Sequence, residues 1–400
     1  MSIEIMKLGL VLEGGGVKGA YHIGALKALL EAGYRFDGVA GTSIGALNAA
    51  MIAQGEFDKL VQIWNCVEAS DILDVDTEMF ERLAGGAKLD KPTLFYFVRL
   101  LRSFPEVYKN STEKMRAFVR ENLNEDKIRR SPMDFGLVTV SLPDFEPHEL
   151  MKEDIPMTEM DEYVIASANF PLYKLIEING KRFIDGGVWD NMPVNLLARQ
   201  GYRRFIVIRT SSKPPKRKFE RDDLQIDYIV PSEPVGKTMQ FTAENIQKNQ
   251  KLGYYDTVKF LKGYVGERFY IHPYGEHEII DCIAAAPRLL FFTLSDKLEI
   301  PHFPDKHENV AAVACVIRAE LGLTQKASDS YCFLTLFELF GALYGVEKFT
   351  VYEARGFMNA VLNACQPHMF CRETFFKSAH PIKSKKLKEI FFALAALGGI

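Results

Sequence analysis

Short apolar runs alternate with helical stripes over the first 60 residues. KLGLVLEG (7–14) is apolar with β-branched content, and VKGAYHIGALKALLEAG (17–33) follows it with one apolar helical face. That face is formed by Ala20, Ile23, Leu26, Leu29 and Leu30. FDGVAGTS (36–43) then predicts a second strand, and IGALNAAMIAQG (44–55) predicts a second helix. This βαβα order is typical of a parallel sheet covered by helices on both faces.

The remaining pattern predicts one large α/β domain followed by helices. Residues 57–130 are mostly helical in pattern, and the longest helical pattern spans about 236–263. Strand-like runs recur at 135–142, 181–187, 204–210, 226–231 and 268–275. We therefore expect a three-layer α/β/α domain with a mostly parallel central sheet over residues 5–280, and a helical region over residues 281–400.

Composition narrows the class of protein. Of 400 residues, 48% are hydrophobic and 25% charged, with a formal net charge of −3, so the chain offers no overall electrostatic basis for binding nucleic acid. Its six cysteines contain no C-x-x-C pair, which indicates reduced thiols. We find no signal-peptide pattern and no apolar run of transmembrane length. A cytoplasmic protein is expected, and secretion without a cleaved signal stays an open alternative.

The second predicted strand ends in GTSIG, which places a serine at a strand-to-helix junction. The five residues are Gly41, Thr42, Ser43, Ile44 and Gly45. A sharp connection of this kind needs small residues on either side, and it projects the serine hydroxyl above the sheet at a helix N-terminus. Ser43 is therefore a candidate nucleophile. The alternative is a structural serine in a tight turn.

A glycine-rich loop precedes this serine and is suited to hold negative charge. It reads GGGVKG, from Gly14 to Gly19, and the likeliest amide donors for an oxyanion are Gly15, Gly16 and Val17. Lys18 either stabilises the loop, binds an anionic head group, or is solvated. Two rival interpretations are weaker. A dinucleotide site would need an acidic residue at the end of the second strand, and a nucleotide P-loop would need Gly-Lys-Ser/Thr.

The base that would activate Ser43 is best sought at Asp185. This residue ends an apolar strand and is followed by Gly186 and Gly187, so it can lie at a tight turn near the sheet edge. A carboxylate in a poorly solvated site can act as a general base, although Asp-Gly is also a common β-turn. Ser43 comes too early for the Ser, acid, His order of α/β-hydrolases. The candidates His22, His148 and His272 read as structural or surface residues.

Together, these three elements resemble the patatin-like phospholipases. That family combines a G-G-G-x-[KR]-G loop, a G-x-S-x-G serine and a D-G-[GA] aspartate, which here are 14–19, 41–45 and 185–187. The resemblance covers residues 7–200 well and extends loosely to about 280. ASANFPLY (166–173) also resembles the stretch that is thought to line the acyl site in the family.

The resemblance implies a Ser43–Asp185 dyad without histidine, in an enzyme that needs neither cofactor nor metal. In this interpretation the loop formed by Gly14, Gly15, Gly16, Val17, Lys18 and Gly19 is the oxyanion hole. The implied substrates are phospholipids, lysophospholipids or other lipid esters, reached through peripheral contact with a membrane. An acyltransferase, a short-chain esterase and a catalytically silent lipid-binding adaptor remain alternatives. Head-group preference and oligomeric state are not predicted.

Two C-terminal motifs have plainer interpretations. The segment 380–400 joins four lysines to an apolar run, which suits an anionic membrane or a helix packed on the core, and we favour packing. CQPHMFC (365–371) has metal-ligand types at three-residue spacing without an obvious fourth ligand, so a zinc site is disfavoured.

Overall fold

A computed structural model of the chain describes residues 6–67, 112–169, 175–214, 217–238 and 241–396. The chain divides into two compact units, Met1–Thr257 (unit 1) and Val258–Ile400 (unit 2). The division falls within the helix α11 (Ala243–Lys262), whereas the sequence pattern set the change from α/β to helical structure at residue 280. Part of the region predicted as helical, residues 68–111, lies outside the described residues.

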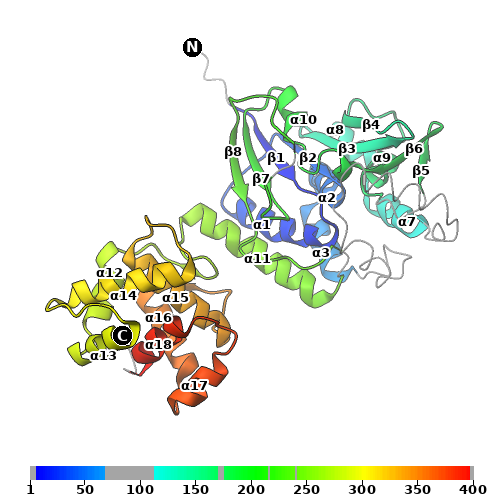
Figure 1. Cartoon of the computed structure of the whole chain (residues 1–400). Coiled ribbons are helices and arrows are strands. Elements are labelled where there is room, and N and C mark those ends of the chain that lie inside the picture. Colours follow the sequence, from blue (N-terminus) through cyan, green and yellow to red (C-terminus); the bar gives the residue numbers. More distant parts are fainter. Residues whose placement is uncertain (1–5, 68–111, 170–174, 215–216, 239–240, 397–400) are drawn as a thin grey trace. The chain divides into compact units, whose positions relative to one another are not determined.

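Unit 1 is built on one central sheet (Figure 1). Its strands are β1 (Leu8–Leu12), β2 (Gly38–Thr42), β3 (Asp134–Leu142), β4 (Glu146–Met151), β5 (Ile176–Ile178), β6 (Lys181–Asp185), β7 (Arg204–Ile208) and β8 (Gln225–Ile229). The order is β5-β6-β3-β2-β1-β7-β8, with β4 also paired to β3. Neighbouring strands from β3 through β2, β1 and β7 to β8 are parallel, while β4 and β6 run antiparallel to β3 and β5 runs antiparallel to β6.

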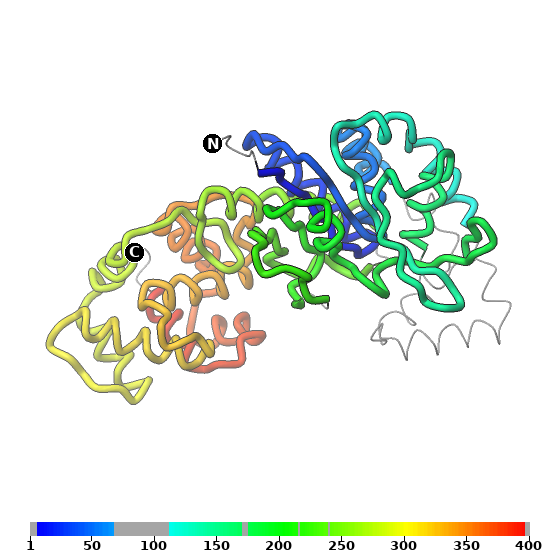
Figure 2. Tube along the Cα trace, turned by 90° about the horizontal axis from the view of Figure 1, so that it is seen from above, coloured from blue at the N-terminus to red at the C-terminus, as the bar shows by residue number. Residues whose placement is uncertain are grey.

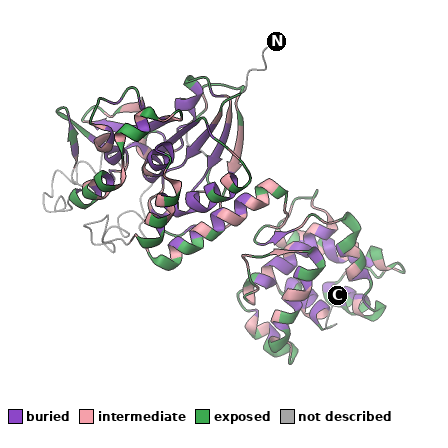
Figure 3. Ribbon diagram, turned by 180° about the vertical axis from the view of Figure 1, so that it is seen from behind, coloured by how far each residue is buried: buried purple, intermediate pink, exposed green. Residues whose placement is uncertain are grey.

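Helices cover both faces of this sheet. Besides α11, the helices among the described residues of unit 1 are α1 (Ala20–Glu31), α2 (Ile44–Ala53), α3 (Phe57–Cys66), α7 (Glu113–Asn122), α8 (Glu125–Arg130), α9 (Met160–Ser167) and α10 (Val194–Arg199). On one face Val11, Ala40 and Val207 form a core with Leu197 of α10. On the other, α2 packs on β1, β2 and β3, and α9 packs on β3 and β6. The strands between are buried (Figure 3). The predicted α/β/α fold class is confirmed.

Two strands of the central sheet escaped the sequence pattern. β4 contains a proline and a histidine in EPHELM, which has no apolar alternation, and β5 is only three residues long. Both lie beside β3 and β6, where the sheet changes from parallel to antiparallel pairing. Their formation depends on hydrogen bonding to those strands, which local propensity does not report.

Unit 2 is helical around an aromatic core, and its path is followed from yellow to red in Figure 2. Its helices are α12 (Glu276–Ala284), α13 (Arg288–Leu298), α14 (Lys306–Leu321), α15 (Asp329–Leu343), α16 (Ala354–Cys365), α17 (Arg372–Ser378) and α18 (Lys385–Ala395), and the short strands β9 (Tyr270–Ile271) and β10 (Val351–Tyr352) pair in parallel. Phe340 and Phe391 stack with ring centroids 3.8 Å apart.

The basic C-terminal segment packs on this core, as the sequence favoured. α18 buries Leu387, Ile390, Phe391 and Leu394. Within the described ranges, no helix combines the length and the apolar character needed to cross a bilayer. In the Cys/His motif, Cys365 is buried and Cys371 is exposed, so the two thiols meet different environments.

Candidate active site

The register of β3 brings the ends of β2 and β6 together. Thr42, the last residue of β2, pairs with Val138, and Asp185, the last residue of β6, pairs with Thr139. β4 occupies the other edge of β3 over the same stretch, so β2 and β6 share one edge and approach each other head-on. Ser43 follows Thr42 directly. Two residues 142 positions apart in sequence thus meet at one point of the sheet.

Ser43 has the backbone of a sharp strand-to-helix turn. Its φ of 58° and ψ of −128° are unfavourable for a non-glycine residue. The turn closes tightly, because a Cβ at Gly45 would lie 2.2 Å from the carbonyl oxygen of Leu12. Ser43 is the N-cap residue of α2, yet its side chain makes no capping hydrogen bond. The hydroxyl is therefore free for another partner.

That partner is the carboxyl group of Asp185. The Ser43 hydroxyl lies near enough to this group to lower its pKa, and the Gly187 N–H donates a hydrogen bond to Oδ1 at 2.7 Å. Burial raises the pKa of Asp185 to about 6, against the lowering effect of these two groups. At neutral pH Asp185 is an ionised, poorly solvated carboxylate beside a serine hydroxyl, which is the arrangement that a general base requires.

The glycine-rich loop is fixed in place by residues that follow β7 and by the turn after Asp185. Gly14 donates its N–H to the carbonyl of Asn191 at 3.1 Å, and its own carbonyl accepts from Asn191 Nδ2 at 3.1 Å and from Thr210 Oγ1 at 2.7 Å. Next to it, the buried pair Glu13 and Arg209 is joined by two bonds of 3.1 Å. The loop is thus held rigidly before any substrate arrives.

The amides of this loop are not equivalent. Val17 donates its N–H to the carbonyl of Thr238 at 2.9 Å, so this predicted oxyanion donor is already paired. Among the described residues, no acceptor is recorded for the N–H groups of Gly15 and Gly16. Gly16 has a φ of 61° and lines the same pocket as Ser43. Lys18 is half-buried, and that burial lowers its pKa despite the nearby Glu13 carboxylate.

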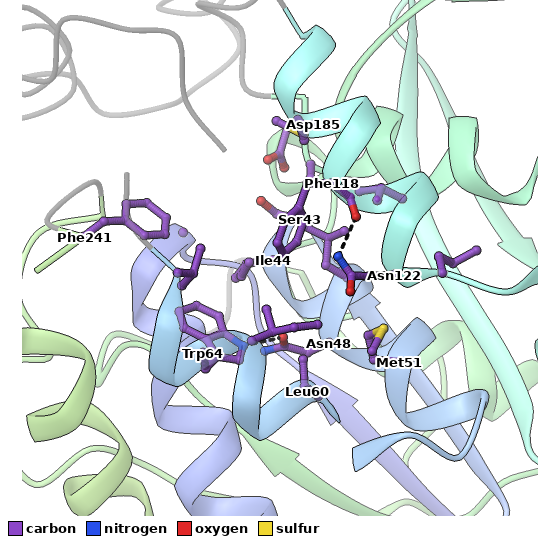
Figure 4. A pocket seen from close by; sticks show the side chains of 18 of the residues that line it. Ser43, Ile44, Asn48, Met51, Leu60, Trp64, Phe118, Asn122, Asp185 and Phe241 are labelled. Atoms are coloured by element: carbon purple, nitrogen blue, oxygen red, sulfur yellow. Dashed lines mark hydrogen bonds between the residues drawn. The ribbon is translucent and has the colours of Figure 1, made fainter. Parts of the chain in front are cut away.

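An apolar pocket extends away from the Ser43–Asp185 pair (Figure 4). Asp185 and Ser43 lie at one end, and Leu60 and Met51 lie towards the other. Its apolar wall comes from α2, α3, α7 and the segment before α11: Ile44, Leu47, Met51, Leu60, Ile63, Trp64, Val67, Met115, Phe118, Val119, Leu123 and Phe241. An apolar pocket that begins at a nucleophile suits the hydrocarbon chain of an ester.

A buried polar network supports the wall of this pocket. Asn48 donates to the carbonyl of Gly19 at 3.2 Å and accepts from Trp64 Nε1 at 3.0 Å, and its amide nitrogen lies 3.2 Å from His22 Nδ1. Burial lowers the pKa of His22 to about 3, so the ring is neutral at physiological pH. His22 thus has a structural role. His148 instead lies 2.9 Å from the Ser141 hydroxyl.

Sequence reasoning missed the residues that hold the site together. The next helix, α10, has Pro193 at its N-cap position, so neither Asp190 nor Asn191 caps it. Asp190 instead accepts the N–H of Met192 at 3.0 Å, and Asn191 anchors the glycine loop. Thr210 had no local signal, since its role depends on a contact 196 positions away.

Several known proteins are similar to this chain in sequence. Residues 10–198 match the family model described as patatin-like phospholipase. The uncharacterized protein YqhO of Bacillus subtilis is 26% identical over 225 residues, which are 52% of this chain and 72% of that protein. Neuropathy target esterase sws of Drosophila persimilis is 61% identical over 44 residues, which span 11% of this chain and only 3% of the fly protein.

Two solved structures also resemble the chain at low sequence identity. VipD from Legionella pneumophila aligns at a TM-score of 0.41 and 14% identity, over 98% of this chain and 90% of that one. The type III effector ExoU, from Pseudomonas aeruginosa, aligns at 0.34 and 15%, over 97% and 78%. The family model covers the loop, the serine and the aspartate alike, and its limits agree with those expected from the three motifs. Residues 10–198 of this chain therefore belong to the patatin-like phospholipase family.

Proposed function

We propose that the protein hydrolyses carboxylic esters of lipids, as a phospholipase A or lysophospholipase, through Ser43 and Asp185. The observation that carries this proposal is the placement of the Ser43 hydroxyl beside the buried Asp185 carboxyl, at the end of an apolar pocket. Membership of the patatin-like family supports lipid hydrolysis in general. The two-residue mechanism is our inference from the geometry.

In the first half-reaction, Ser43 Oγ attacks the ester carbonyl carbon while its proton passes to Asp185. A positioned base of this kind contributes roughly 10²–10⁴-fold to the rate. The negative charge that develops on the carbonyl oxygen is stabilised by the N–H groups of Gly15 and Gly16, and each such donor is worth roughly 10²–10³-fold. Collapse of the tetrahedral intermediate expels the alcohol, which takes the proton from Asp185 and leaves an acyl-Ser43 ester.

In the second half-reaction, Asp185 accepts a proton from water as the water oxygen attacks the acyl-Ser43 carbonyl. The same two amides stabilise the second oxyanion. Release of the fatty acid returns the proton to Ser43 Oγ and restores the ionised Asp185. The cycle uses groups of this chain and water alone, so the proposal requires neither a metal nor an organic cofactor.

The pocket favours a lipid over a small ester. Its wall offers apolar side chains along most of its length, and burial of each methylene of an acyl chain contributes about 0.8 kcal/mol. A short-chain ester would leave most of this wall unused. Peripheral contact with a membrane and a cytoplasmic location remain predictions that go with this substrate class.

The test is turnover by the purified full chain on phospholipids, lysophospholipids, glycerides and short-chain esters. Ser43→Ala and Asp185→Asn should each abolish hydrolysis, whereas the exposed matched control Asp222→Asn should retain it. Full activity in Ser43→Ala would refute the mechanism. Absence of turnover by the wild type on every substrate would refute the proposed function and favour a lipid-binding adaptor.

An added acceptor alcohol distinguishes hydrolase from acyltransferase, because both share the acyl-Ser43 intermediate. Release of free fatty acid that is unaffected by the alcohol supports hydrolysis. Transfer of the acyl group to the alcohol in preference to water would assign the protein to the acyltransferases instead.

A further inference from the structure

The strands that carry Ser43 and Asp185 are not hydrogen-bonded to each other. β2 and β6 each pair with β3 and end where the other ends, so the sheet ladder alone leaves a break between the two residues. The proposed proton transfer from Ser43 to Asp185 crosses this break. Any relative movement of the two strand ends would separate the two groups.

One short segment bonds to the backbone on both sides of the break. At the end of α9, Ser167 Oγ accepts the Ser43 N–H at 3.1 Å. Two residues later, the carbonyl of Asn169 accepts the Asp185 N–H at 2.8 Å, and Asn169 Nδ2 donates to the carbonyl of Phe183 at 3.2 Å. Ser167 and Asn169 are both completely buried.

The bond from Ser43 to Ser167 also bears on the strained backbone of the nucleophile. A non-glycine residue with φ of 58° and ψ of −128° persists only where its surroundings hold it. On the carbonyl side, Ser43 is held by the N–H of Ala46 at 2.9 Å, within the first turn of α2. On the amide side, the hydroxyl of Ser167 is the acceptor, and its loss would leave a poorly solvated N–H without that partner.

We propose that Ser167 is a positioning residue for the reaction, which acts with the Asn169 carbonyl as a clamp that sets the separation of Ser43 and Asp185 across the break between β2 and β6. This inference rests on the proposed function of the dyad. It gives the side chain of Ser167 a role distinct from lining the pocket, because its hydroxyl bonds to the nucleophile's own amide. Neither Ser167 nor Asn169 needs to touch the substrate.

The test compares Ser167→Ala with Ser167→Thr, which keeps the hydroxyl, and Ser167→Cys, which keeps the volume with a weaker acceptor. We expect Ser167→Ala to lower kcat about 10- to 100-fold with little change in KM, as for an interaction felt mainly in the transition state. Ser167→Cys should be intermediate, and Ser167→Thr should restore most of kcat. Ser141→Ala removes another buried hydroxyl of unit 1, which lies near His148, and is the matched control.

Two further readouts separate positioning from mere structural support. The nearby Ser43 hydroxyl lowers the pKa of Asp185, so moving it away in Ser167→Ala should move the acidic limb of kcat/KM to higher pH. The rate at which a fluorophosphonate modifies Ser43 should fall in parallel with kcat, and this measurement needs no lipid substrate. Thermal unfolding confirms that each variant is folded.

The outcomes are distinct for the two proposals. The clamp is overturned, and the proposed function is left intact, if the wild type hydrolyses lipid and the folded Ser167→Ala variant behaves like it. That outcome means an unchanged kcat, an unchanged acidic limb of kcat/KM and an unchanged rate of labelling by the fluorophosphonate. A wild type that is labelled at Ser43 without turning over any lipid overturns the function, and the labelling rates of the variants then decide on the clamp. If Ser167→Ala does not fold, Ser167→Thr and Ser167→Cys test the clamp instead. A higher kcat in Ser167→Thr than in Ser167→Cys would support the clamp, and equal kcat values in these two variants would contradict it.

Discussion

Each unit of the chain buries carboxylates, and one from each unit, Glu338 and Asp185, shows how differently they are satisfied. Glu338 in unit 2 accepts three backbone N–H groups, from Glu267, Arg268 and Phe269, each at 2.9 Å. Asp185 in unit 1 accepts one backbone N–H, and the Ser43 hydroxyl beside it lowers its pKa. Burial raises the pKa of both groups.

The two carboxylates differ in whether the groups beside them can release a proton. A backbone amide does not release its proton at physiological pH, so the bonds to Glu338 can only tie residues 267–269 to α15. A serine hydroxyl can pass its proton to the carboxylate when it attacks a carbonyl. Burial by itself therefore does not mark a catalytic carboxylate, whereas the identity of its donors does.

The comparison is tested most strongly by parallel amide substitutions. Asp185→Asn should lower kcat roughly 10³-fold or more, because the base is lost while its volume is kept. Glu338→Gln should leave kcat nearly unchanged and lower the free energy of unfolding by about 1–3 kcal/mol, because its NH₂ group meets an N–H donor. Steady-state kinetics and urea unfolding on both variants measure this. Equal loss of kcat in the two would break the comparison.

Ionisation of Asp185 should lower the free energy of unfolding, although it is required for activity. Its pKa rises on folding from 3.8 to about 6, so the folded state binds the proton more tightly and wild-type stability falls as pH increases between these values. Asp185→Asn lacks this cost. Its free energy of unfolding relative to wild type should therefore increase by up to about 3 kcal/mol between pH 3.5 and pH 8. A constant difference across that range would show that burial does not raise this pKa.

The pH–rate profile tests the same carboxylate in its working state. The base accepts a proton only when it is ionised, so kcat/KM should be constant above the pKa of Asp185 and fall about tenfold per pH unit below about 6. Glu338→Gln should show the same limb as wild type. A limb near pH 4 in the wild type would contradict the buried, poorly solvated environment of the dyad.

The smallest expected effect concerns the pocket that Asp185 faces. Met51 lies eight residues after Ser43 in the α2 helix, about 12 Å along its axis. Met51→Phe should therefore narrow the far part of the pocket and lower kcat/KM for long acyl chains about fivefold, with little change for short-chain esters. A chain-length series measures it. A uniform loss across all lengths would indicate general disruption rather than a shortened acyl site.

The sequence predicted the parts of the site that are local and left out those that depend on distant contacts. Apolar periodicity located β1, β2, β3, β6, β7 and β8, and GTSIG marked the turn at Ser43, because a tight strand-to-helix connection has its own residue requirements. The two missed strands of the central sheet, β4 and β5, take their conformation from β3 and β6. Ser167 and Thr210 are single hydroxyls in ordinary contexts, so only the folded chain gives them partners.

The glycine-rich loop shows the same limit within one motif. Three glycines in a row predicted accessible amides, and the structure records no acceptor for Gly15 and Gly16 among the described residues. Val17 follows the same pattern, yet its N–H is bonded to Thr238 from a segment more than 200 positions away. Residue types indicate which amides can approach a ligand, whereas tertiary contacts determine which of them are available.

Because β2 and β6 meet end to end, the register of β6 along β3 decides whether the side chain of residue 185 lies on the same face of the sheet as Ser43. Successive side chains of a strand point to opposite faces of the sheet, so only every second residue of β6 can face Ser43. A single-residue insertion or deletion that shifted β6 along β3 would turn Asp185 to the other face and bring Ile184 or Gly186 into its place. A shift of this kind would preserve the strands, the core and the pocket while moving this carboxyl group away from Ser43, so the chain would remain folded without the base that we propose.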